Sequence, residues 1–89
     1  MKEIILDCKE MTSKSATYEY ISKEMSFPKF FGNNLDALYD VLSVWSEKTS
    51  ITFINCNYLY EYLGEYGLRI IDVFKEVEEE NSNIVLKIL

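Results

Sequence analysis

Short apolar runs alternate with longer segments in which apolar residues recur every three or four positions. The short runs Lys2–Asp7, Ile51–Ile54 and Ile84–Leu89 are strand-like, because they carry consecutive β-branched or aliphatic residues. The longer segments have helical spacing and predict helices over about 16–25, 34–45, 57–63 and 68–80. The order β-α-α-β-α-α-β favours parallel strands joined by helical crossovers. The pattern therefore predicts an α/β fold, in which helices cover a small three-stranded parallel sheet.

The breaks between these elements also follow from the sequence. Pro28–Asn33 is predicted to be a loop, in which Gly32 is free to take a positive φ. Asn34 or Asn33 is expected to cap the helix that follows. Two further breaks are predicted, a polar one at Glu47–Ser50 and a turn at Gly64–Gly67.

Composition narrows the range of functions. The 89 residues fit one domain, 1–89, and carry a net charge of −6 from 15 acidic and 9 basic residues. This charge argues against binding to nucleic acid or to an anionic membrane, and it permits a basic protein partner. No apolar run has the length of a membrane span or of a signal-peptide core, so we expect a cytoplasmic protein.

The chain offers few residues that suit catalytic or redox chemistry. There is no histidine, which removes the commonest general base and the commonest metal ligand. Cys8 and Cys56 are the only cysteines, and each follows an apolar run, so we interpret both as thiols that pack as small apolar side chains. We therefore expect a binding protein without a cofactor or metal, and not an enzyme.

The predicted helix over 34–45 has two different faces. At about 100° per residue, Leu35, Leu38 and Leu42 share one side, which Val41 and Trp45 flank. The opposite side carries Asp36, Tyr39, Asp40 and Ser43.

The two aspartates of this helix differ in what local stability explains. Asp36 lies in the first turn, where the macrodipole stabilises a carboxylate by about 0.3–1 kcal/mol. Asp40 lies mid-helix, one turn from a like charge and without a lysine or arginine to pair with, so its position is slightly unfavourable. Asp40 is therefore a candidate for recognition of a cation.

A second acidic surface is predicted at the end of the helix over 68–80. Glu76, Glu78, Glu79 and Glu80 crowd its last turns, where the macrodipole favours cations. A solvated helix end explains these residues equally well when they are taken alone. Two acidic helix faces together indicate a negative surface kept for a partner.

Aromatic residues add to this indication. Phe30 and Phe31 are adjacent in the loop, so both are not expected to be fully buried, and exposed aromatic side chains are common anchors of protein interfaces. Four tyrosines surround the predicted helix over 57–63, and the sequence leaves open whether they form a second contact surface or a satellite core: Tyr58, Tyr60, Tyr62 and Tyr66.

The segment Phe27–Trp45 resembles the barstar family, whose members inhibit the ribonuclease barnase inside the cell. It contains the family pattern Pro-x-aromatic-aromatic-Gly-x-Asn-Leu-Asp-Ala-Leu-aromatic-Asp without a gap. A second match covers Ile70–Glu80 and leads into Ile84–Leu89. The resemblance extends over the whole chain in element order, and it implies a barstar-like fold with three parallel strands and packed helices.

The resemblance also implies a mechanism. The Pro28–Asn33 loop and the helix over 34–45 would plug the active site of a basic, barnase-like ribonuclease in a 1:1 complex with a monomeric inhibitor. Asp40 would imitate an RNA phosphate, Asp36 would add an anionic contact, and Glu80 would act mainly through long-range attraction. The implied partner-binding residues are Phe30, Gly32, Asn34, Leu35, Asp36, Tyr39, Asp40, Ser43, Val44, Trp45, Glu76 and Glu80.

The chain departs from the family pattern at several of these positions. Phe30 stands where a tyrosine is usual, Tyr39 where a tryptophan is usual, and Ser43 where a threonine is usual. Val44 replaces a glycine and adds bulk, and Asn33 removes a negative charge. These departures leave the phosphate mimic intact and bear mainly on which partner is bound.

Two alternatives remain at the level of sequence. A barstar-like domain could bind another toxin or a regulatory protein in place of a ribonuclease. A small hydrolase or cation site could instead use Asp36 and Asp40 to hold Mg²⁺ through waters, although the same face offers no clear third ligand.

Overall fold

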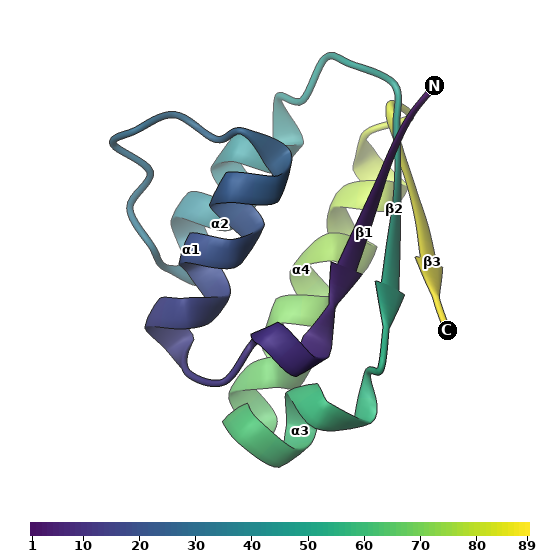
Figure 1. Cartoon of the computed structure of the whole chain (residues 1–89). Helices are drawn as coiled ribbons and strands as arrows, with labels where there is room; N and C mark the ends of the chain where they lie inside the picture. Colours follow the sequence, from purple (N-terminus) through teal and green to yellow (C-terminus); the bar gives the residue numbers. More distant parts are fainter.

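Figure 1 shows a computed structural model that describes residues 1–89. The elements are β1 (Lys2–Asp7), the 3₁₀ turn η1 (Cys8–Glu10), α1 (Lys14–Met25), α2 (Leu35–Ser43), β2 (Thr49–Ile54), α3 (Asn57–Leu63), α4 (Glu65–Glu80) and β3 (Ile84–Ile88). The predicted order of strands and helices is confirmed, and η1 is an addition that the sequence pattern did not predict. None of the helices has the length and apolar character needed to cross a membrane.

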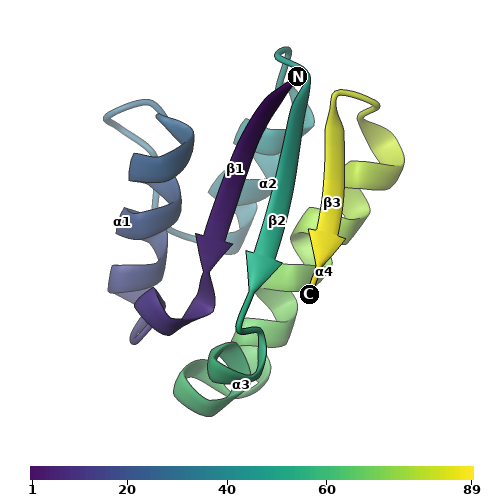
Figure 2. The same cartoon turned by 45° about the vertical axis from the view of Figure 1, so that its right-hand side comes forward.

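The three strands form one parallel sheet in the order β1-β2-β3. Ile4 pairs with Ile51, and Ile51 pairs with Leu86, so apolar side chains from neighbouring strands lie side by side. The helices lie on one side of the sheet (Figure 2). This arrangement confirms the predicted α/β fold with a three-stranded parallel sheet.

Alternation along the strands explains which face the helices cover. In β1, Ile4 and Leu6 are buried, whereas Glu3 and Ile5 are exposed. Successive side chains of a strand point to opposite faces, so the buried set faces the helices. Phe53 of β2 meets Phe74 of α4 there, edge to face with ring centroids 5.0 Å apart, near the centre of the core.

Three predicted boundaries were wrong. The second helix ends at Ser43 and does not reach Trp45. The fourth helix begins at Glu65, so the predicted turn at Gly64–Gly67 shrinks to Gly64, which has φ 60°. β2 begins at Thr49, inside the predicted polar break, because its first residues pair with β1.

The close contact between α3 and α4 explains why the fourth helix begins at Glu65 and includes Gly67. Gly67 is buried within α4, and a Cβ atom added to it would lie 2.7 Å from the carbonyl oxygen of Leu59 in α3. A glycine in this helix therefore lets two backbones approach closely, and its role is packing. The sequence pattern alone indicated a turn, because glycine is the residue most typical of turns.

Candidate protein-binding surface

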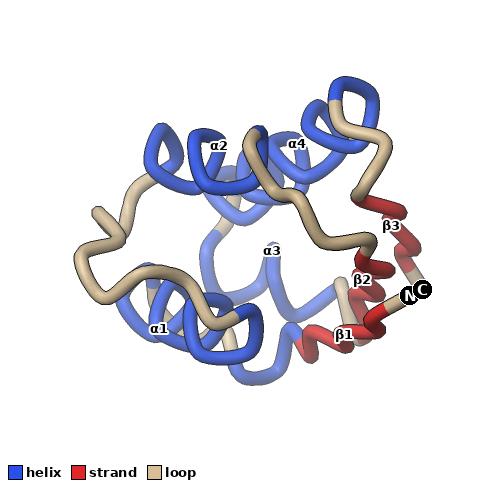
Figure 3. The backbone as a smooth tube through the Cα atoms, turned by 90° about the horizontal axis from the view of Figure 1, so that it is seen from above, coloured by secondary structure: helices blue, strands red, loops and turns tan.

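The predicted faces of α2 agree with its packing. Leu38 and Leu42 are fully buried, and Leu35 is half-buried against the core. Asp36 and Asp40 are exposed on the opposite side. The buried leucines hold the helix in the orientation that presents both carboxylates to solvent, and Figure 3 shows α2 next to α4.

The loop before α2 is held by local hydrogen bonds. The amide of Phe31 donates to the Pro28 carbonyl at 3.0 Å and closes a turn. Asn34 is the N-cap, since its side-chain oxygen accepts from the Ala37 amide at 2.7 Å and its side-chain NH₂ donates to the Gly32 carbonyl at 3.1 Å. The predicted cap is confirmed, and both polar atoms of the Asn34 side chain already have partners within the chain.

Gly32 was free to take a positive φ but does not do so. The left-handed residue of the loop is Asn33, with φ 50°, and asparagine tolerates this region better than most residues. Gly32 contributes space instead. A Cβ atom there would lie 3.2 Å from the Cβ of Ala37, where the loop folds against the first turn of α2.

The adjacent phenylalanines of the loop have different environments. Phe30 is 90% exposed. Phe31 is half-buried and packs against Phe27, with ring centroids 4.9 Å apart, and against Tyr18 at 6.0 Å. The expectation that the two rings would not both be fully buried is borne out, and the more exposed ring belongs to Phe30.

A hydrogen bond joins the two acidic helices. The Tyr39 hydroxyl on α2 donates to the carboxylate of Glu80 on α4. This bond raises the pKa of Tyr39, and the negative charges of Glu76 and Asp40 act in the same direction. The carboxylates of α2 and α4 therefore lie on one continuous surface around Tyr39. We define the acidic face as Asp36, Asp40, Glu76 and Glu80.

The C-terminal end of α2 is fixed by two asparagines that the sequence pattern did not single out. The Asn81 side chain donates to the carbonyls of Leu42 and Trp45, each at 3.0 Å. Asn83 donates to the same Trp45 carbonyl at 3.1 Å. Helix C-termini leave carbonyls without intrahelical partners, and these amides satisfy them from a distant segment. A polar Asn-x-Asn after a helix was the available signal, but its partners lie about 40 positions away.

The environments of the three residues at the end of α2 differ, and these residues are Ser43, Val44 and Trp45. The hydroxyl of Ser43 donates to the Asp40 carbonyl at 3.0 Å, and Val44 is 79% exposed. Trp45 is half-buried, and its indole N–H donates to the hydroxyl of Thr49 at 3.0 Å. The ring of Trp45 therefore supports the fold, while Val44 extends the exposed surface of α2.

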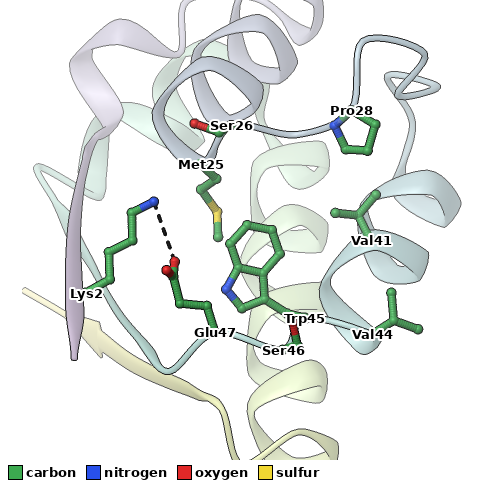
Figure 4. A pocket seen from close by; sticks show the side chains of 9 residues that line it. All are labelled: Lys2, Met25, Ser26, Pro28, Val41, Val44, Trp45, Ser46 and Glu47. Carbon is green, nitrogen blue, oxygen red and sulfur yellow. Dashed lines mark ion pairs between the residues drawn. The ribbon is translucent and has the colours of Figure 1, made fainter.

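An open groove of about 480 Å³ lies beside the end of α2. Figure 4 shows its lining, in which Lys2 and Glu47 form an ion pair of 3.6 Å. The lining residues are Lys2, Met25, Ser26, Pro28, Val41, Val44, Trp45, Ser46 and Glu47. The groove has neither histidine nor a cluster of carboxylates, so it suits apolar contact better than chemistry.

No group of three or more cysteine, aspartate or glutamate side chains is arranged to hold a metal ion. Asp36 and Asp40 therefore lack a third protein ligand. Cys8 and Cys56 are free thiols. Burial, followed by the neighbouring Cys56 thiol, raises the pKa of Cys8 to about 12. A thiol with such a pKa stays protonated and is a poor nucleophile.

The tyrosines near α3 divide between core and surface. The Tyr66 hydroxyl shares a hydrogen bond with that of Tyr18, which lies in the core. Tyr58 and Tyr62 pack against each other with centroids 5.8 Å apart, and Tyr60 is exposed. Some of these tyrosines therefore pack against the core, and others form part of the surface.

Comparison with known proteins places these features in a family. Residues 1–89 match the family described as "Barstar (barnase inhibitor)". The chain is also similar to a Bacillus subtilis (strain 168) protein named "Putative ribonuclease inhibitor YrdF", with 28% identity over 81 residues, which cover 90% of this chain and 89% of that protein. The match over the full length agrees with the fold and with the loop and helix that carry the family pattern. The chain belongs to the barstar family.

Proposed function

We propose that this protein inhibits a basic, barnase-like ribonuclease in the cytoplasm by covering its active site in a 1:1 complex. Membership of the barstar family and similarity to a protein named as a ribonuclease inhibitor support this role. Active sites that cleave RNA bind phosphates with cationic side chains, so an inhibitor can compete by offering carboxylates in the same positions.

The observation that carries the proposal is that no carboxylate of the acidic face has an ion-pair partner. The one ion pair in the structure joins Lys2 and Glu47, away from Asp36 and Asp40. Like charges one turn apart on a helix destabilise it slightly, so this arrangement costs stability in the free protein. A cationic partner would remove that repulsion and form charge-assisted hydrogen bonds with the same carboxylates.

Each part of the surface has a role in this proposal. Asp40 occupies the phosphate position, and Asp36 with Glu76 supplies further anionic contacts. Phe30 and Val44 provide apolar contact at the two ends of α2, where they are 90% and 79% exposed. The net charge of −6 attracts a cationic enzyme from a distance.

Gly32, Asn34 and Leu35 act in the proposal by shaping the loop and the first turn of α2. Tyr39, Ser43 and Trp45 have hydrogen-bond partners within the chain, and their exposed edges complete the surface. Glu80 is proposed to act through attraction and through its bond to Tyr39.

Titration of a barnase-like ribonuclease with the purified protein tests the proposal. RNA cleavage should fall linearly and reach zero at one equivalent, and the complex should elute as a 1:1 species. The association rate should fall steeply as salt is added, because exposed charges are screened over about 10 Å at 0.1 M ionic strength. Unchanged cleavage in the presence of excess protein, with several basic ribonucleases, would contradict the proposal and favour a non-ribonuclease partner.

A further inference from the structure

A row of five aromatic rings runs beneath the loop Pro28–Asn33. We call it the aromatic row, and it consists of Trp45, Phe27, Phe31, Tyr18 and Tyr66. The centroid distances between successive rings are 5.9, 4.9, 6.0 and 6.4 Å. These separations lie in the range of favourable edge-to-face and tilted contacts. The row therefore connects the end of α2 with the start of α4 through the loop.

Both ends of the aromatic row are anchored outside the loop. Trp45 donates its indole N–H to Thr49 at the start of β2. At the other end, the Tyr18 hydroxyl on α1 is hydrogen bonded to the Tyr66 hydroxyl on α4. The Nζ of Lys14 lies 4.2 Å from the centroid of the Tyr66 ring and adds a cation–π contact.

Phe31 is the one residue of Pro28–Asn33 that is not exposed. Its ring lies between Phe27 and Tyr18, which are both buried. The remaining ties of the loop are the turn closed by the Phe31 amide and the side-chain bond from Asn34 to Gly32. The link between the loop and the rest of the protein therefore depends mainly on one ring.

We infer that Phe31 is a positioning residue, which holds the loop in its binding conformation through the aromatic row and leaves Phe30 free to contact the partner. This inference rests on the proposed function, because it assigns the loop to the interface. A loop that is ordered before binding loses less conformational entropy when the complex forms. Phe31 would thus raise affinity without supplying the main contact.

Backbone ¹⁵N relaxation of the free protein, combined with binding kinetics, tests the inference. In Phe31→Ala the order parameters of residues 29–33 should fall below about 0.6, the value typical of flexible backbone. The affinity of Phe31→Ala for the ribonuclease should fall by about tenfold or more. Phe31→Tyr should keep both the order parameters of residues 29–33 and the affinity at their wild-type values. Phe30→Ala should weaken binding while the loop stays ordered.

A stability control separates positioning from general weakening. Phe74→Leu removes packing from the Phe53–Phe74 contact in the core, which is not part of the aromatic row. It should lower the free energy of unfolding without changing the order parameters of residues 29–33. The inference is overturned if Phe31→Ala leaves the loop ordered, or if Phe74→Leu disorders it equally. If the wild-type protein binds no ribonuclease, the proposed function fails, and relaxation of the free protein still decides whether Phe31 holds the loop.

Discussion

The two crossovers of this fold connect the same kind of strands in different ways. Between β2 and β3, α3 and α4 are joined by Gly64 alone, and their backbones touch at Gly67. Between β1 and β2, α1 and α2 are separated by residues 26–34, and Phe30 in this stretch is 90% exposed. Burying a phenylalanine side chain stabilises a protein by about 1.5–3 kcal/mol, so the first crossover forgoes a stabilisation of that size by leaving Phe30 exposed.

This contrast indicates where function has shaped the chain. The contact between α3 and α4 is explained by packing, whereas the first crossover carries the 90% exposed ring of Phe30 and two carboxylates, Asp36 and Asp40, without an ion-pair partner. Features that cost stability and have no partner inside the molecule are expected at binding sites. Substitutions at the contact between α3 and α4 should therefore affect folding, and substitutions on the exposed surface of the first crossover should affect binding.

The largest effect on stability is expected at the contact between α3 and α4. Gly67→Ala would place a Cβ atom 2.7 Å from the Leu59 carbonyl oxygen and should lower the free energy of unfolding by about 3 kcal/mol. In the matched control Gly32→Ala, the added Cβ atom meets two side-chain atoms, the Ala37 Cβ at 3.2 Å and the Asn34 Nδ2 at 3.4 Å, and the free energy of unfolding should change by less than about 1 kcal/mol. Urea unfolding measures both. Equal losses would contradict the contrast between the crossovers.

A smaller loss of stability is expected at the C-terminal end of α2, where the Asn81 side chain donates hydrogen bonds to carbonyls. Asn81→Ala removes the side-chain donor of the Leu42 carbonyl and one of the two donors of the Trp45 carbonyl, and it should cost about 1–2 kcal/mol. Asn57→Ala, at an exposed position in the first turn of α3, is the control and should cost less than about 0.5 kcal/mol. Thermal unfolding of the two variants checks the difference, and an Asn81 variant as stable as wild type would show that the bonds contribute nothing.

The smallest effect is a loss of stability in alkali. The pKa of Cys8 rises from 9.0 to about 12, and burial followed by the bond to Tyr66 raises the pKa of Tyr18 above its ordinary value of 10.0. Folding therefore favours the protonated forms. The stability from Cys8 is fully present below about pH 9, that from Tyr18 below about pH 10, and each decreases as pH rises further. Urea midpoints measured from neutral pH upward should fall in that range, and Cys8→Ala should remove the earlier part of the decrease.

Regular patterns allowed much of the fold to be predicted from the sequence. The strand-like runs and the leucine spacing of α2 depend on local periodicity, and the structure has the order they predict. The errors occurred where distant contacts decide. Gly67 was interpreted as part of a turn because its contact with Leu59 is invisible in a local pattern.

On the candidate protein-binding surface, too, local features were predicted and contacts between distant segments were not. The outward position of Asp36 and Asp40 followed from helical spacing and the family pattern, and Asn34 was one of two predicted caps. The bonds from Asn81 to the end of α2 and from Tyr39 to Glu80 were not predicted, since they join residues 36–41 positions apart. Pairing over such distances is set by tertiary packing, which a single sequence does not reveal.

The role proposed for Asp40 is tested by calorimetric measurement of how tightly Asp40→Ala binds a barnase-like ribonuclease. Glu3→Ala is the matched control, because it removes one exposed carboxylate from the sheet face that the helices do not cover. We expect Asp40→Ala to weaken binding by about 2–5 kcal/mol without loss of folding stability, and Glu3→Ala to change binding by less than about 0.5 kcal/mol. Asp40→Ala binding as tightly as wild type would contradict the claim that this carboxylate takes the place of an RNA phosphate.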